Sequence, residues 1–343
     1  MILFCSDYQE GAHPSILQKL QDINLLQNPG YGTDDICHRA ATLIKEKCVC
    51  PEADVHFLVG GTQTNTTVIS AALRPHQGVL CAHTGHINVH ETGAIEAVGH
   101  KVLGVTSPDG KITAAQVERE VLLQADFEHT VKPGMVYISF PTELGTLYTL
   151  EELTTLRKVC DKHRLYLFLD GARLGYGLCG EGNDVSLTDI ARLCDVFYIG
   201  GTKVGALFGE AVIINHPALK TDFRYFIKQR GGLLAKGWLL GVQFQTLFED
   251  DKFFTIAQHA QSLAMLIRNS LRRMHIPFLI ESPTNQQFPI LPDSIIENLK
   301  ERYTLCFQEK IDDTHTAVRI CTSWATREED VLELIKDLGE LLS

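Results

Sequence analysis

The sequence LYLFLDGAR occupies residues 165–173, and VFYIGGTKVG occupies residues 196–205. Each begins with an apolar run that ends at a glycine-rich turn, which is typical of a strand buried on both faces. Apolar runs of this kind predict five strands, at residues 55–59, 79–82, 135–140, 165–170 and 196–200.

Between these strands the apolar residues follow a helical spacing. The predicted helices include 62–74, 149–163 and 187–194, and Thr149 with Glu152 forms a capping-box signature. Strands that alternate with helices predict an α/β fold, in which helices cover both faces of a mainly parallel sheet. Sheets of this class bind their ligands at the C-terminal ends of the strands.

From about residue 240 the pattern changes. A long helical stretch, 239–275, is followed by short strands at 278–281, 303–307 and 317–322, and a capping box at Thr326 and Glu329 predicts a final helix. We therefore expect two domains, a large one over residues 1–240 and a smaller α+β domain over residues 241–343.

The composition limits the class of protein. The 343 residues are 45% apolar and 21% charged, as in ordinary globular chains. A net charge of -11 disfavours binding to nucleic acid or to anionic membranes. The sequence has no apolar stretch of about 18 residues, and the ten cysteines form no CxxC pair, so we expect reduced thiols and a cytoplasmic protein.

The segment GGTQTN, residues 60–65, follows a predicted strand and opens a predicted helix. Glycines allow a close approach of the backbone to a ligand, and the free N–H groups of a helix N-terminus suit a phosphate. A glycine-rich turn capped by Thr62 is the simpler alternative. The segment matches neither GxGxxG nor GxxxxGK[ST], which weakens both nucleotide interpretations.

Asp170 and Lys203 each follow a predicted strand. A carboxylate at a strand end can hold the ring nitrogen of a pyridine cofactor in its protonated form, although a turn aspartate is equally common there. Lys203 is surrounded by glycines and apolar residues. Poor solvation favours the uncharged amine, which can attack a carbonyl group.

Three histidines crowd one segment, His83, His86 and His90, and Glu91 follows them. His86 and His90 are four residues apart and would share a helix face, as some zinc ligands do, but the sequence indicates no further ligand. We therefore predict no metal site. Stacking of an imidazole on an aromatic cofactor is the preferred interpretation, with core or helix-capping roles for the other two histidines.

These residues resemble a known group. The segments Ser6-Asp7, Tyr31-Gly32, GGTQTN, HINVHETGA, LDGAR, GGTK, KQRGG and RICTSWAT occur in the order found in L-threonine aldolases. Those enzymes are members of the β-eliminating lyase group of fold-type I pyridoxal-phosphate enzymes. The resemblance implies pyridoxal 5′-phosphate as cofactor, a large domain with a mainly parallel seven-stranded sheet, and a smaller C-terminal domain.

The resemblance also implies a reaction, the cleavage of the Cα–Cβ bond of L-threonine, L-allo-threonine or a related β-hydroxy amino acid to glycine and an aldehyde. In this comparison Lys203 resembles the lysine that bonds to the cofactor, Asp170 the partner of the pyridine nitrogen, and His86 the ring-stacking histidine.

The remaining roles concern the phosphate and the substrate. Gly61, Thr62 and Gln63 resemble the phosphate cradle, with Arg230 as the expected basic residue and Lys228 or Lys236 as alternatives. The α-carboxylate of the substrate is expected at Ser6, Arg173 and Arg319. Tyr31 resembles a tyrosine that a neighbouring subunit contributes, so a homodimer or homotetramer with its active site at the subunit interface is implied.

The chain departs from this group in the loop after the strand 135–140. Many threonine aldolases have a second histidine there, whereas residues 141–146 are PTELGT. We therefore choose His86 as the catalytic base, with His83 or a bound water as alternatives, because a neutral imidazole transfers protons near pH 7.

Three other functions stay open. The same residues suit β-elimination from a cysteine-like or aromatic amino acid. A catalytically silent protein that binds pyridoxal phosphate is the second alternative, although such a protein needs neither Lys203 nor the arginines. A nicotinamide oxidoreductase is the third, and it lacks the glycine fingerprint.

Overall fold

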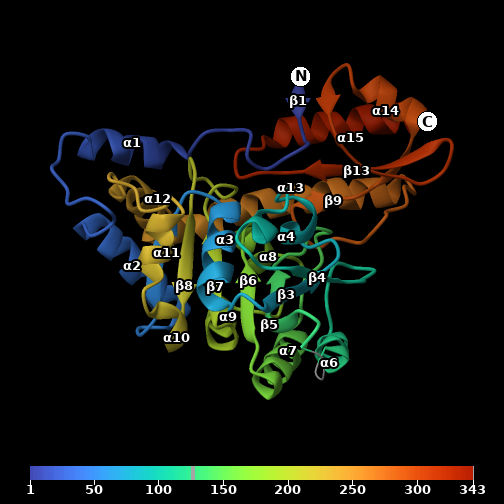
Figure 1. Cartoon of the computed structure of the whole chain (residues 1–343). Helices are drawn as coiled ribbons and strands as arrows, with labels where there is room; N and C mark the ends of the chain where they lie inside the picture. The colour runs from blue at the N-terminus through green and yellow to red at the C-terminus, as the bar shows by residue number, and fades with distance from the viewer. Residues whose placement is uncertain (125–127, 343) are drawn as a thin grey trace.

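The computed structural model describes residues 1–124 and 128–342. A seven-stranded sheet forms its centre, in the order β2-β8-β7-β6-β5-β3-β4 (Figure 1). The strands are β2 (Asp54–Leu58), β3 (Gln77–Ala82), β4 (Val102–Val105), β5 (Lys132–Ser139), β6 (Tyr166–Asp170), β7 (Val196–Gly200) and β8 (Glu210–Ile214). Strand β8 runs antiparallel to both of its neighbours, and the other pairs are parallel. The predicted mainly parallel sheet is confirmed.

Helices cover both faces of this sheet, as predicted. Successive residues of β7 alternate between the two cores, with Phe197 and Ile199 in one and Val196 and Tyr198 in the other. The first core is closed by α1 (Pro14–Ile23), α2 (Asp35–Cys48), α6 (Ala114–Leu123), α7 (Leu150–His163), α8 (Leu174–Leu178), α9 (Leu187–Leu193) and α12 (Trp238–Phe248). The second is closed by α3 (Gly61–Ala72), α4 (His86–Val89), α5 (Ala94–Ala97), α10 (Pro217–Lys220) and α11 (Phe223–Gln229).

The five predicted strands of the sheet are present, with ends shifted by three residues or fewer. The predicted capping box at Thr149 is confirmed, because its hydroxyl accepts from Glu152 N–H and the Glu152 side chain accepts from Thr149 N–H. The other two strands of this central sheet, β4 and β8, were not predicted.

The predicted helical stretch 239–275 is two helices. A short 3₁₀ turn, η1 (Glu249–Asp251), separates α12 from α13 (Lys252–Arg273). Asp250 and Asp251 both have φ of 56°, which an α-helix does not allow. The predicted helical stretch is therefore present, but a break divides it into two helices.

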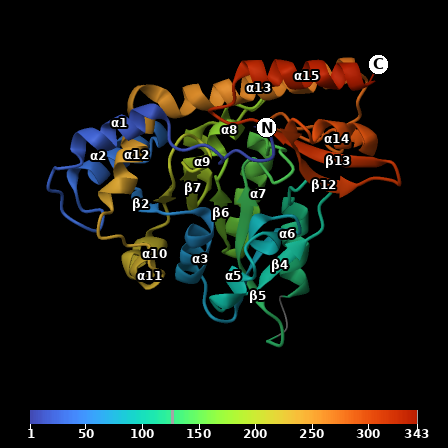
Figure 2. The same ribbon diagram turned by 90° about the horizontal axis from the view of Figure 1, so that it is seen from above.

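The C-terminal part contains a second sheet. Its elements are β9 (Gln286–Gln287), β10 (Ile290–Pro292), α14 (Asp293–Leu299), β11 (Tyr303–Thr304), β12 (Cys306–Lys310), β13 (His315–Cys321) and α15 (Glu328–Leu342). Strand β1 (Ile2–Leu3) pairs with β11, so the N-terminal segment lies against this part. Figure 2 shows α13 and α15 side by side.

Two predictions in this part are wrong. Residues 278–281 form no strand but a single bridge from Phe278 to Pro289, because Pro277 and Pro289 have no N–H to donate to a ladder. The last helix begins at Glu328, and the Thr326 hydroxyl accepts from Ser323 N–H instead of capping it.

A third hydrophobic core lies between α13, α14, α15 and the second sheet, and includes Phe4. Helix α13 contributes Ala257 to the first core and Ile267 to the third. The division into domains at residue 240 stays a prediction. Within the described part of the chain, no helix has the length and apolar character needed to cross a bilayer.

Candidate active site

A cavity of about 320 Å³ lies at the C-terminal ends of β5, β6 and β7. Among the expected site residues, it is lined by Gly61, Thr62, His86, Asp170, Arg173 and Lys203. The acids Glu143 and Glu210 also line it, and no role was predicted for either. The sheet thus brings together residues that are more than 140 positions apart in the sequence.

Lys203 lies in a tight turn directly after β7. Val204 N–H and Ala206 N–H both donate to the carbonyl of Gly201, and the Tyr176 hydroxyl donates to the carbonyl of Lys203. Burial lowers the pKa of the Lys203 ammonium group, and the nearby Arg173 guanidinium lowers it further. The position therefore favours the uncharged, nucleophilic amine.

Asp170 ends β6 and is buried. Its Oδ1 accepts from Ala172 N–H at 2.9 Å, and its Oδ2 accepts from the Tyr137 hydroxyl and from Asn65 Nδ2. The glycine of LDGAR is required here, because a Cβ on Gly171 would lie 1.9 Å from the carbonyl oxygen of Tyr198. The carboxylate is therefore fixed in direction at the floor of the cavity.

His86 begins α4 and is bonded to a buried acid. Its Nδ1 lies 2.7 Å from Glu91 Oε1, and that oxygen also accepts from Asn65 Nδ2 at 2.6 Å. Burial alone would lower the pKa of His86, but the Glu91 hydrogen bond and the nearby Asp170 charge raise it. Glu91 therefore orients the imidazole, and Asn65 links this pair to Asp170.

Glu143 contacts the main chain of the same helix. Its Oε1 accepts from His86 N–H at 2.9 Å and from Ser139 Oγ at 2.7 Å. Burial raises the pKa of Glu143, and the neighbouring Asp170 adds to this. An acid thus occupies the loop in which many threonine aldolases have a second histidine.

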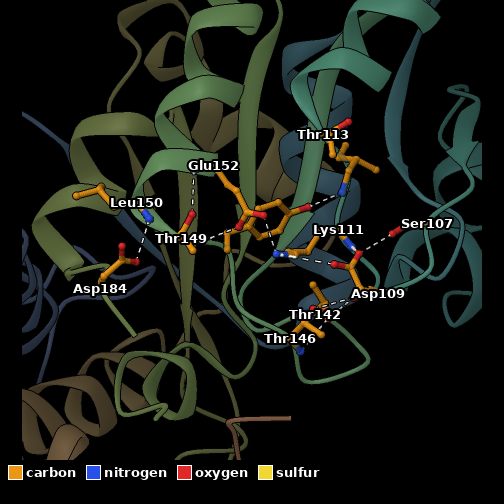
Figure 3. Close-up of polar contacts among 12 residues, drawn as sticks. Ser107, Asp109, Lys111, Thr113, Thr142, Thr146, Thr149, Leu150, Glu152 and Asp184 are labelled. Carbon is orange, nitrogen blue, oxygen red and sulfur yellow. Dashed lines mark hydrogen bonds and ion pairs between the residues drawn. The ribbon is translucent and has the colours of Figure 1, made fainter. Parts of the chain in front are cut away.

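The loop that carries Glu143 is held against residues 107–113 (Figure 3). Thr146 Oγ1 donates to the carbonyl of Asp109 at 2.7 Å and lies 2.7 Å from Thr142 Oγ1. Lys111 Nζ joins Asp109 to Glu152 at the start of α7. These bonds position Glu143 relative to the cavity.

The expected phosphate cradle is the N-terminus of α3. The first main-chain bond of this helix is from Thr64 N–H to the carbonyl of Gly60, so the N–H groups of residues 61–63 precede the helical ladder. A Cβ on Gly61 would lie 3.2 Å from the Tyr198 hydroxyl. Three N–H groups beside a residue without a side chain suit a phosphate.

Gln63 and Arg230 do not line the cavity in this chain. The Gln63 side chain accepts from Val59 N–H and donates to the carbonyl of Arg230. The Nε of Arg230 in turn donates to Ser70 Oγ. Their side chains fasten the loop after α11 to α3. Any contact of Gln63 with a phosphate would therefore be made by its main-chain N–H.

Arg173, one of the residues expected to bind the substrate carboxylate, forms an ion pair with the buried Asp7. Arg173 Nε lies 2.7 Å from Asp7 Oδ2, and Arg173 Nη2 lies 2.9 Å from Asp7 Oδ1. Asn285 Nδ2 also donates to Asp7 Oδ2. Ser6 and Arg319 lie outside the cavity lining. Ser6 Oγ and Arg319 Nε are buried and have no hydrogen-bond partner among the described residues.

Tyr31 is exposed and lines a second cavity, not the one that contains Lys203. Lys228 Nζ lies 4.8 Å from the centre of its ring. The site of this chain therefore forms without Tyr31.

The residues that sequence reasoning missed are Asp7, Asn65, Tyr137, Glu143 and Glu210. Asp7 and Asn65 lie inside the quoted segments Ser6-Asp7 and GGTQTN, so position in a motif could have indicated them. Tyr137, Glu143 and Glu210 carry no such local signal, because their roles depend on which strands become neighbours.

The sheet and its covering helices are those of the fold-type I pyridoxal-phosphate enzymes. The aspartate aminotransferase of Thermus thermophilus has this fold, with a TM-score of 0.73 at 14% identity over 99% of this chain and 91% of that one.

The model of the beta-eliminating lyase family matches residues 6–291, and the chain belongs to that family. It is 30% identical to the low specificity L-threonine aldolase of a Pseudomonas species, over 99% of this chain and 98% of that protein. The structure of a threonine aldolase from Leishmania major is 46% identical, with a TM-score of 0.98 and full coverage of both chains.

Proposed function

We propose that this protein is a pyridoxal-phosphate-dependent aldolase that cleaves L-threonine, L-allo-threonine or a related β-hydroxy amino acid to glycine and an aldehyde. The observation that carries the proposal is one cavity lined by both Lys203 and Asp170. The names of the Pseudomonas and Leishmania relatives support the same reaction.

The residues present fit the cofactor. Lys203 supplies the amine that bonds to an aldehyde, Asp170 the carboxylate for a ring nitrogen, and the N–H groups of Gly61, Thr62 and Gln63 a place for phosphate. The Arg230 guanidinium would support the phosphate from the loop after α11. When bound, the cofactor withdraws the electrons of the breaking Cα–Cβ bond.

The protein's own groups hold the substrate and move its proton. Ser6, Arg173 and Arg319 bind the α-carboxylate, which sets the orientation of the Cα–Cβ bond. His86 would stack on the ring of a bound cofactor, and its Nε2 would accept the proton of the β-hydroxyl group, because Glu91 binds Nδ1 and leaves Nε2 for this task. Glu91 thus acts as a positioning residue.

The first experiment is an absorbance spectrum of the purified protein with and without glycine. A visible-edge band that shifts on adding glycine is expected from the wild type. Borohydride should abolish this band in the wild type and leave the cofactor covalently attached at Lys203, whereas Lys203→Ala should retain no covalently attached cofactor. A colourless wild-type protein that gains no band when the cofactor is added would contradict the proposal.

β-Elimination is the second candidate, since the family description itself names that reaction class. The aldolase releases acetaldehyde from L-threonine, whereas elimination from L-cysteine releases pyruvate and ammonia. Parallel assays of both substrates separate the two functions. A protein that holds the cofactor but turns over neither substrate would favour the catalytically silent alternative.

We also propose that the active site lies at the interface of a homodimer or homotetramer. Exposed Tyr31, outside the cavity of its own chain, is consistent with a role in a neighbour's site. A cytoplasmic location stays part of the proposal, supported by ten cysteines that are all free thiols.

A further inference from the structure

Glu210 is the first residue of β8 and lies beside the expected phosphate cradle. Its Cα is paired with Leu58 on β2 and with Gly200 on β7. The cradle begins at Gly60, two residues after Leu58, and Lys203 follows three residues after Gly200. The backbone of Glu210 therefore lies between the cradle and the lysine turn. The residue is only 4% exposed, and it lines the same cavity as Gly61 and Lys203.

The hydrogen bonds around Glu210 determine which of its oxygens can carry a proton. Gly209 N–H donates to Thr202 Oγ1 at 2.9 Å, and the Thr202 hydroxyl donates to Glu210 Oε1 at 3.2 Å. Oε1 is thus an acceptor. Oε2 is buried and has no hydrogen-bond partner in residues 1–124 and 128–342. A proton on this group belongs on Oε2, where it needs an acceptor.

Among the described residues, the titratable side chains of Lys203, Asp170 and Tyr198 interact electrostatically with Glu210. Burial raises the pKa of Glu210 to about 8, with Asp170 adding to the shift and Lys203 opposing it. Burial also raises the pKa of Tyr198, so that group stays uncharged. In these surroundings Glu210 is mostly neutral at pH 7.

We infer that Glu210 is a neutral acid in the cofactor-loaded protein and that its Oε2–H group donates a hydrogen bond to a phosphate oxygen of the cofactor. The inference rests on the proposed function, which supplies the phosphate. A carboxylate would repel a phosphate dianion, so the proton on Glu210 and the bound phosphate stabilise each other. Affinity for a phosphate-bearing ligand therefore falls as Glu210 ionises.

The test measures binding of pyridoxamine 5′-phosphate to the cofactor-free full chain between pH 7 and pH 10. This ligand carries the phosphate but has no aldehyde to bond to Lys203. Glu210→Gln keeps a neutral donor and acceptor of the same shape at every pH. We expect equal Kd values at pH 7, and above pH 8 a Kd of the wild type that rises relative to the variant by about tenfold per pH unit.

Two controls complete the design. Pyridoxamine without phosphate should show the same pH dependence in both proteins. Calorimetry at pH 9 in two buffers of different ionisation heat should count nearly one proton more taken up with pyridoxamine 5′-phosphate by the wild type than by Glu210→Gln, because any uptake at the ring nitrogen beside Asp170 is common to both proteins. Equal pH slopes, or equal proton uptake by the two proteins, would overturn the inference. Failure of the wild type to bind pyridoxamine 5′-phosphate at any pH would instead contradict the proposed function.

Discussion

The ion pair between Asp7 and Arg173 explains how the N-terminal segment is held at the cavity. Burial alone would raise the pKa of Asp7, but the Arg173 charge and its hydrogen bonds hold that pKa below the usual value. Two of the three guanidinium nitrogens of Arg173 contact Asp7. A substrate carboxylate that binds Arg173, as we propose, would therefore meet a guanidinium whose orientation is already fixed.

Replacing Asp7 by Asn should destabilise the protein by about 3 kcal/mol, because the partly buried Arg173 guanidinium loses its counter-charge. Urea unfolding measures this, and the KM for the amino acid should rise as well. The matched control is Glu297→Gln, which breaks the exposed pair with Lys300 and should change neither quantity. An equal response of the two variants would show that the buried pair does not hold the segment.

The His86–Glu91 pair gives a prediction on pH. The pKa of His86 is raised in the folded protein, so its contribution to stability is complete below the unfolded pKa of about 6.5 and is lost as pH rises through the folded pKa. Glu91→Gln should remove this contribution. From pH 6 to pH 8 the free energy of unfolding should therefore fall more in the wild type than in the variant.

The same substitution should move the acid limb of kcat/KM to lower pH, since the imidazole then loses its proton more readily. Asp312→Asn, which breaks the partly exposed pair with His315, is the control and should leave the limb in place. An unchanged limb in Glu91→Gln would assign the base to a group other than His86.

The absence of a Cβ at Gly171 can be tested by adding one. In Gly171→Ala the new Cβ would meet the Tyr198 carbonyl at 1.9 Å, so β6 and β7 must separate and Asp170 must shift. We expect a loss of about 3 kcal/mol, at the upper end of overpacking, and a weaker hold on the cofactor. Gly11→Ala is the control, because a Cβ there meets no atom within 4 Å. Similar melting temperatures for the two variants would contradict this account.

At the scale of elements, the loop between β5 and α7 depends on short side-chain bonds. Thr146→Val removes the bonds to the Asp109 carbonyl and to Thr142, so Glu143 and the main chain of His86 lose their support. A loss of about 1 kcal/mol is expected, together with a raised KM. The control is Thr155→Val, which removes a hydroxyl that donates to the Glu151 carbonyl within α7, and it should leave KM unchanged. If both variants keep the wild-type KM, the anchored loop does not position the site.

The sequence predicted elements well where one local pattern determines them. The strand 196–200 is apolar throughout and has the predicted ends, and the polar cap Thr149 fixes the start of α7. The pattern failed where tertiary context decides. Strand β8 starts at the buried acid Glu210, and it forms between β2 and β7, which are distant in the sequence. The break at residues 249–251 depends on two aspartates with positive φ.

The site was predictable to the same extent. Asp170 and Lys203 lie where their strand ends placed them, beside Gly61 and Thr62. The engagement of Arg173 by Asp7 was not predictable, because it joins residues 166 positions apart.

At the scale of the whole molecule, the position of Tyr31 leads to a mixing experiment. Lys203→Ala and Tyr31→Ala should each be nearly inactive. If Tyr31 serves the neighbouring site, co-refolded dimers of the two variants contain one intact site in every mixed pair, so about a quarter of wild-type activity should return. Light scattering gives the oligomeric state of each sample. No recovery from a verified mixed dimer would place Tyr31 in its own chain's site or outside catalysis.

The pairing of β1 with β11 has a consequence for biosynthesis. Ile2 leaves the ribosome about 300 residues before its partner Tyr303. Asp7 is likewise synthesised before both of its partners, first Arg173 and later Asn285. The central sheet is complete at Ile214, so it can assemble early, whereas the partners of Ile2 and Asp7 in the C-terminal part are made only later in translation. A nascent chain halted before β11 would thus contain the residues that line the cavity but would lack the strand that pairs with β1.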